Sequence, residues 1–87
     1  MTTILIIDDD DPLRKSFNKL LTEEGYVVQS AASGEAGLRI VRESMPDLVI
    51  LDVRLPGMSG LETFKTIHAI DPRVPTIIMT ASGTTET

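Results

Sequence analysis

The chain has 87 residues, of which 41% are hydrophobic and 24% charged, and its net charge is -5. This length allows one domain, and the composition is that of a globular protein. The acidic balance and the few aromatic residues argue against direct nucleic-acid binding, and the absence of cysteine excludes disulfides and thiolate metal sites. The sequence contains neither a signal-peptide pattern nor an apolar stretch of about 20 residues, so we expect a cytoplasmic protein without membrane contact.

Short apolar runs along the chain predict buried strands. They lie at 4–7, 48–51 and 77–79, and a weaker strand is expected over 26–31. The three strong runs are continuously apolar rather than alternating, which is typical of strands that are buried on both faces of a parallel sheet.

Amphipathic segments separate these strands and predict three helices. They run over about 12–24, over 34–44, and from 59 to a stop at 71–72. Asp11, Ser33 and Ser59 are the expected N-caps, and Ser59 with Glu62 has the spacing of a capping box. The expected buried stripes are Leu13, Phe17, Leu20 and Leu21 in the first helix, Ala36, Ile40 and Val41 in the second, and Leu61, Phe64 and Ile67 in the third. Exposed helix positions are expected for Arg14, Lys15 and His68.

The order of these elements predicts the fold class. Strands and helices alternate from the first strand to the fourth, which indicates an α/β fold with right-handed crossovers and a parallel sheet covered by helices on both faces. No linker or internal repeat divides the chain, so residues 1–87 are expected to form a single domain.

Polar side chains follow three of the predicted strands at the points where they end. Asp8 to Asp11 follow the first strand, Asp52 ends the third, and Thr80 and Ala81 follow the fourth. Parallel sheets bind ligands at the carboxyl ends of their strands. If the first and third strands are neighbours, Asp8 or Asp9 meets Asp52, and such crowded carboxylates need a cation or raised pKa values. Oxygen ligands of this kind suit magnesium. A solvated loop with a helix cap is the simpler explanation of each acid alone, whereas their joint placement favours a functional site.

Three motifs together resemble the receiver domain of bacterial response regulators. They are Ile-Leu-Ile-Ile-Asp-Asp-Asp at 4–10 with Arg14 following, Leu-Val-Ile-Leu-Asp-Val-Arg-Leu-Pro-Gly-Met-Ser-Gly at 48–60, and Pro-Thr-Ile-Ile-Met-Thr-Ala at 75–81. The resemblance covers essentially the whole chain. It implies a flavodoxin-like, doubly wound sheet with strand order 2-1-3-4.

The resemblance also implies a role for each matching residue. Asp52 takes a phosphoryl group from a sensor histidine kinase of a two-component system. Asp8, Asp9 and Asp52 hold Mg²⁺ together with the backbone carbonyl of Arg54. Thr80 donates a hydrogen bond to the phosphoryl group as a switch residue, and the small Ala81 leaves room beside it. Such a receiver assists its own phosphorylation and is not a turnover enzyme.

The last residues suggest a subclass. Ala-Ser-Gly-Thr-Thr-Glu-Thr at 81–87 resembles receivers of NtrC-like, enhancer-dependent transcription activators, in which output domains follow the receiver. Receivers continue with a fourth helix, a fifth strand that ends in a lysine, and a fifth helix. No lysine follows Lys65 here, so we expect a truncated receiver with weak switching. An open sheet edge and an uncovered apolar face then predict self-association.

Three other functions are less consistent with the sequence. A phosphatase with an aspartyl nucleophile requires a second Asp, as general acid, two residues after the first, and this chain has Arg54 there. A nucleotide-binding fold needs a glycine-rich loop after the first strand, where this chain has acids. A receiver-like interaction module that is never phosphorylated remains the main alternative.

Overall fold

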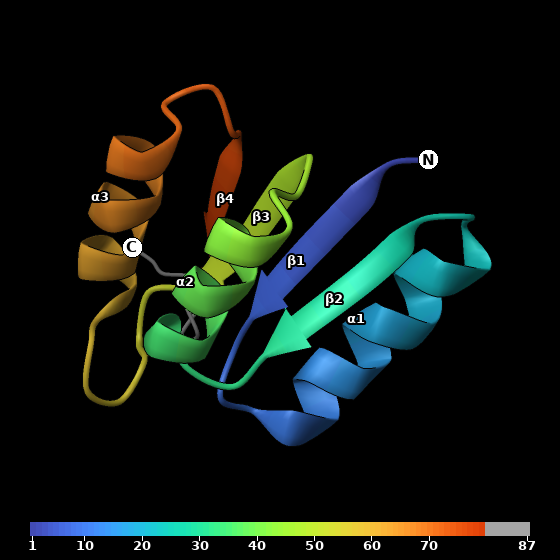
Figure 1. Cartoon of the computed structure of the whole chain (residues 1–87). Coiled ribbons are helices and arrows are strands. Elements are labelled where there is room, and N and C mark those ends of the chain that lie inside the picture. Colours follow the sequence, from blue (N-terminus) through green and yellow to red (C-terminus); the bar gives the residue numbers. More distant parts are fainter. Residues whose placement is uncertain (80–87) are drawn as a thin grey trace, which may run out of the picture.

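Strands and helices alternate along the chain, as the sequence predicts (Figure 1). The computed structural model describes residues 1–79. Its strands are β1 (Thr3–Ile7), β2 (Val27–Ala31), β3 (Leu48–Asp52) and β4 (Thr76–Met79), and its helices are α1 (Asp11–Glu23), α2 (Gly34–Glu43) and α3 (Gly60–Ile70). No helix among these residues is long and apolar enough to cross a membrane.

The strands form one parallel sheet in the order β2-β1-β3-β4, which confirms the predicted order. β1 and β3 are direct neighbours, and Ile7 pairs with Leu51 near their carboxyl ends. At the same end of the sheet, Asp52 pairs with Met79 of β4. The carboxyl ends of β1, β3 and β4 therefore lie at one edge of the sheet.

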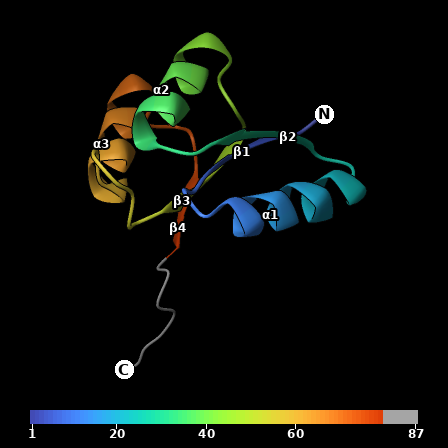
Figure 2. The same ribbon diagram turned by 90° about the horizontal axis from the view of Figure 1, so that it is seen from below.

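The helices cover the two faces of the sheet unequally. Figure 2 shows α2 and α3 on one face and α1 on the other. The core has two parts accordingly. The cluster under α2 and α3 contains Leu5, Ile7, Ala31, Leu38, Val41, Val49, Leu51, Leu55 and Ile67. The smaller cluster on the side of α1 contains Ile4, Ile6 and Ile50, with Phe17 and Leu21 packed against it.

The helix caps agree with the predictions in two cases out of three. Ser33 caps α2, and Ser59 forms a full capping box with Glu62 at the start of α3. The N-cap of α1 is Asp10 rather than the predicted Asp11. The Asp10 carboxylate accepts a hydrogen bond from the Leu13 backbone N–H at 3.1 Å, so the helix begins one residue earlier than Pro12 suggests.

Three residues of the predicted buried stripes are exposed instead. They are Leu13 and Leu20 of α1 and Leu61 of α3. In α3 the buried face is made by Gly60, Thr63 and Ile67 instead. The small Gly60 and Thr63 let this face of α3 approach its neighbours closely. Leu61 does not belong to that face and therefore points toward solvent.

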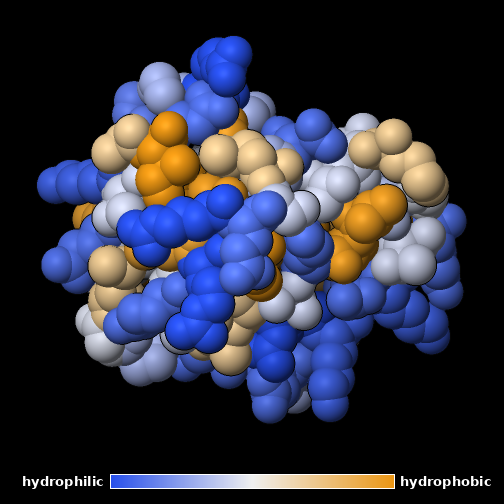
Figure 3. Space-filling view, viewed as in Figure 1, coloured by the Kyte–Doolittle hydropathy of each residue, from blue (hydrophilic) through white to orange (hydrophobic). Residues whose placement is uncertain are grey.

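The β4 edge of the described sheet exposes apolar side chains. Ile77 keeps 51% and Ile78 38% of its surface accessible. Within residues 1–79, β4 pairs with β3 alone. The surface in the view of Figure 3 is largely hydrophilic, with hydrophobic side chains gathered in separate patches.

Candidate functional site

Two carboxylates are placed side by side by the pairing of β1 with β3. Asp8 directly follows β1, and Asp52 is the last residue of β3. The register of these strands runs up to Ile7 and Leu51, so the next residue on each strand is one of the two acids. The Asp8 N–H donates to the Ala31 carbonyl at 3.0 Å, which holds the end of β1 in the sheet.

Asp9 joins these two residues in a group of three acids. A carboxylate oxygen from each of Asp8, Asp9 and Asp52 lies within 4.8 Å of the others. Asp8 and Asp52 keep only 1% and 6% of their surface accessible, whereas Asp9 is exposed. The grouping that the sequence predicts is therefore present, with two buried members and one member at the rim.

Burial and the neighbouring carboxylates both raise the pKa of Asp8. Desolvation raises the pKa of Asp8 above its ordinary value of 3.8, and the nearby charge of Asp52 raises it further. A hydrogen bond from the Asp10 backbone N–H, at 2.9 Å, works against this rise. The ionised form of Asp8 is thus held in a place that disfavours it, which is the condition that a cation relieves.

One oxygen of Asp8 makes the case for a cation more specific. Asp8 Oδ1 accepts the hydrogen bond from Asp10, but the buried Oδ2 has no hydrogen-bond partner among residues 1–79. A buried polar atom without a partner is rare and calls for an unseen water or ion. The all-oxygen donor set fits a hard divalent cation such as Mg²⁺.

The backbone around Asp52 is held from both sides. The Arg54 N–H donates to Asp52 Oδ1 at 3.0 Å, which orients the carboxylate. The Val53 N–H donates to the Met79 carbonyl at 2.9 Å and the Val53 carbonyl accepts from the Gly60 N–H at 3.1 Å. The carboxylate of Asp52 is therefore presented by a fixed peptide rather than by a mobile loop.

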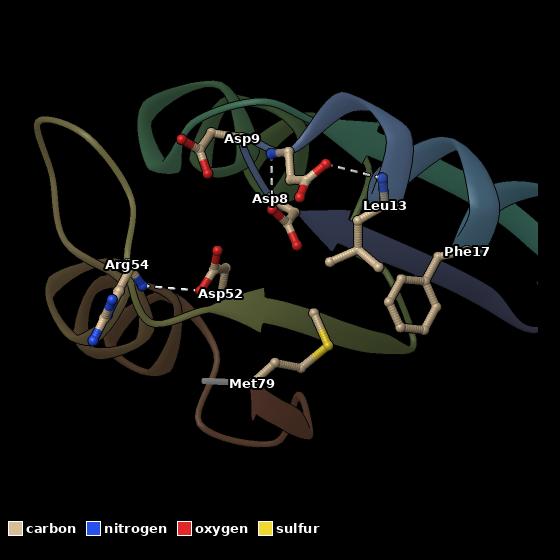
Figure 4. A pocket seen from close by; sticks show the side chains of 8 residues that line it. Asp8, Asp9, Leu13, Phe17, Asp52, Arg54 and Met79 are labelled. Carbon is tan, nitrogen blue, oxygen red and sulfur yellow. Dashed lines mark hydrogen bonds between the residues drawn. The ribbon is translucent and has the colours of Figure 1, made fainter. Parts of the chain in front are cut away.

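The acids line a pocket of about 440 Å³ whose other wall is apolar. Figure 4 shows Asp8 and Asp52 facing this space, with Leu13 and Phe17 of α1 and Met79 of β4 on the other side. A pocket of this kind limits the access of water to one side of the carboxylates, which strengthens electrostatic interactions there.

Arg14 lies closer to the acidic group than its predicted position on a solvated helix face. It was expected on a solvated face, yet its side chain keeps 16% of its surface accessible. Its guanidinium donates to the Asp8 backbone carbonyl at 2.7 Å and pairs with Asp11. A basic residue one helical turn after an acidic strand end is the signal that could have found it. Lys15 and His68 are exposed as predicted.

The structure tests the predicted roles of the other three site residues, Arg54, Thr80 and Ala81, only in part. Arg54 lines the pocket, and the predicted use of its carbonyl as a metal ligand stays a prediction. Thr80 and Ala81, the predicted switch residue and its small neighbour, lie outside the described residues.

Comparison with known proteins matches this chain to one protein family. The model of the response regulator receiver domain family matches residues 4–87. The transcriptional regulatory protein AfsQ1 of Streptomyces coelicolor is 46% identical over 81 residues, which are 93% of this chain and 36% of that protein. Sporulation initiation phosphotransferase F of Bacillus subtilis is 45% identical over 80 residues, which are 92% of this chain and 64% of that protein.

A third relative and a solved structure point the same way. The transcriptional regulatory protein GlrR of Escherichia coli is 44% identical over 80 residues, 92% of this chain and 18% of that protein. The chain thus spans less than two thirds of each of these three relatives. The structure of the response regulator protein TrrA from Thermotoga maritima, in complex with Mg(2+)-BeF, has a TM-score of 0.90 at 37% identity, covering 95% of this chain and 72% of that one.

Proposed function

This chain belongs to the response regulator receiver domain family, and on that premise we propose that it accepts a phosphoryl group on Asp52 from a histidine kinase. The observation that carries the proposal is the buried Asp52 carboxylate beside Asp8 and Asp9, with carboxylate oxygens of all three within 4.8 Å. A lone structural Asp at a strand end has no reason to be surrounded by two further acids.

We further propose that Mg²⁺ is held by Asp8, Asp9, Asp52 and the backbone carbonyl of Arg54. The unpartnered Oδ2 of Asp8 supports this assignment, as does the all-oxygen donor set. When bound, the ion supplies the positive charge that lets an anionic phosphoryl group approach an anionic carboxylate.

The transfer step follows from the chemistry of Asp52. One carboxylate oxygen of Asp52 attacks the phosphorus of a phosphohistidine and forms a new O–P bond. The N–P bond breaks, its electron pair stays on the imidazole nitrogen, and that nitrogen takes up a proton. The product is an acyl phosphate on Asp52, and the hydrogen bond from the Arg54 N–H keeps the carboxylate oriented during attack.

Chemical trapping tests this assignment. The protein is incubated with Mg²⁺ and a small acyl-phosphate donor, and hydroxylamine is then added. We expect one phosphoryl adduct by intact-mass spectrometry and conversion to a hydroxamate in the peptide that contains Asp52, because only an acyl phosphate reacts in this way. The absence of any adduct, or an adduct at another residue, overturns the proposal and favours a receiver-like module that only binds partners.

The wider role is proposed from the relatives. AfsQ1 and GlrR are named as transcriptional regulatory proteins, and we propose that this receiver controls transcription in the cytoplasm through an output domain of the NtrC-like class. In this role it assists its own phosphorylation and is not a turnover enzyme.

We also propose that the 87-residue chain self-associates through its β4 edge. Ile77 and Ile78 expose apolar surface, and among residues 1–79 the backbone of β4 pairs with β3 alone. We expect a dimer or larger assembly in light scattering at micromolar concentration. Ile77→Lys should shift the population toward monomer, because a charged side chain at a strand edge opposes pairing.

The matched control for this edge is Leu61→Lys, which places the same charge at an equally exposed apolar residue of α3. It should leave the assembly unchanged. A monodisperse wild-type monomer, or an equal effect of both substitutions, contradicts self-association through β4.

A further inference from the structure

We propose that Gly60 is a positioning residue for the phosphoryl-accepting site: its missing side chain lets the start of α3 lie directly against the peptide that follows Asp52. This inference rests on the proposed function, since it assigns to Gly60 a task in holding the Asp52 carboxylate and the Arg54 carbonyl in place. Gly60 touches neither the ion nor the phosphoryl group and acts through the backbone alone.

The space around Gly60 carries the argument. A Cβ atom at this position would lie closer than 3.0 Å to the Asp52 carbonyl oxygen, to Val53 Cα and to the Val53 carbonyl carbon. All three are backbone atoms, which have no alternative rotamer to adopt. Contacts this short are essentially never seen for a real Cβ, so any side chain larger than hydrogen must displace either α3 or the end of β3.

Hydrogen bonds show that neither partner is free to move. The Gly60 N–H donates to the Val53 carbonyl at 3.1 Å, and the Val53 N–H donates to the Met79 carbonyl at 2.9 Å on the other side. The first turn of α3 is itself held by the capping box of Ser59 and Glu62. The backbone of Val53 is thus held by α3 through its carbonyl and by β4 through its N–H.

The backbone conformation at position 60 does not by itself require glycine. Among residues 1–79, positive φ angles occur at Gly25 and Gly57, and Gly60 is not one of them. An alanine at position 60 therefore has an allowed backbone and is excluded by space alone. Gly60 is the first residue of α3, directly after the N-cap Ser59, so the close approach to the β3 backbone is what requires glycine there.

Gly60→Ala is expected to weaken Mg²⁺ binding more than it weakens the fold. We expect the Asp52–Val53 peptide to yield to this contact, and its shift moves the Asp52 carboxylate and the Arg54 carbonyl with it. Changes to the groups that orient metal ligands typically lower metal affinity by about 10- to 100-fold. We expect the Mg²⁺ affinity, measured by calorimetry with the metal alone, to fall at least about tenfold.

Gly34→Ala is the matched control. A Cβ at Gly34 would also lie closer than 3.0 Å to another atom, but that atom is the side-chain oxygen of Thr63, between α2 and α3. Urea unfolding should show that both variants lose stability, whereas only Gly60→Ala should lose Mg²⁺ affinity. Equal affinity losses in the two variants, or an unchanged affinity in Gly60→Ala, overturn the inference.

A measurement on the wild type covers the case in which Gly60→Ala does not fold. In an NMR titration with Mg²⁺, the amide signals of Gly60 and Arg54 should shift together, and that of Gly34 should stay in place. A Gly60 amide that does not respond while Arg54 does shows that α3 is not coupled to the site. If neither amide responds and calorimetry detects no Mg²⁺ binding, the proposed metal site fails, and the inference fails with it.

Discussion

Replacing Asp52 by asparagine should abolish phosphoryl uptake. The amide lacks the anionic oxygen that attacks phosphorus, so labelling by a small acyl-phosphate donor in the presence of Mg²⁺ should fall at least about 100-fold. The side chain keeps its shape, and its Oδ1 can still accept the hydrogen bond from the Arg54 N–H that the wild type makes at 3.0 Å. Intact-mass spectrometry measures the loss directly as the disappearance of the single phosphoryl adduct.

Asp10→Asn provides the matched control for this experiment. Asp10 lines the same pocket but lies outside the group of three acids. Asparagine caps helices as well as aspartate does, so α1 should keep its start. We expect Asp10→Asn to be labelled like the wild type. Full labelling of Asp52→Asn shows that the acceptor is another group, and an equal loss in Asp10→Asn shows that the effect is not specific to Asp52.

Asp8→Asn should stabilise the protein at neutral pH when no divalent cation is present. Burial raises the pKa of Asp8 above 3.8, so ionisation of this group favours the unfolded chain. The penalty is absent below pH 3.8, where Asp8 is protonated in both states. It grows as the pH rises through 3.8 and is complete above the raised folded-state pKa. Asparagine removes it and keeps an oxygen for the hydrogen bond from the Asp10 N–H.

The same substitution should remove the response to Mg²⁺. A ligand at about 100 times its Kd stabilises the folded state by about 2.7 kcal/mol, so the wild type should gain several degrees in Tm when EDTA is replaced by saturating Mg²⁺. Asp8→Asn removes one acidic member of the cluster, and its gain should be much smaller. Circular dichroism melts at pH 7 and at a pH below 3.8, each with and without the ion, separate the two effects.

Glu43→Gln serves as the control for charge alone. It removes one negative charge at an exposed position of α2, outside the acidic cluster. It should change Tm only slightly and leave the Mg²⁺ response intact. If Asp8→Asn destabilises the protein without Mg²⁺ at neutral pH, the three acids are not in electrostatic conflict and the case for a cation between them is lost.

The sequence alone determined the elements, their order and the identity of the acids. Continuously apolar runs predicted buried parallel strands, and the caps at Ser33 and Ser59 were correct because capping depends on residues only two or three positions away. The acids followed from one further rule, that the carboxyl ends of parallel strands share an edge of the sheet. Asp8 and Asp52 obey it because β1 and β3 are neighbours.

Tertiary structure decided which side chains those elements turn inward. Four consecutive acids look alike in the sequence, but the pairing of β1 with both neighbours buries Asp8, leaves Asp9 at the rim and makes Asp10 the helix cap. The inward turn of Arg14 depends on how α1 leaves the sheet.

The need for glycine at position 60 is likewise a property of the assembled fold. It arises where the start of α3 meets the backbone of β3, an approach that no local pattern encodes. Local interactions among a few residues determine helices, strands and caps, whereas the depth and direction of a side chain depend on which elements pack against it.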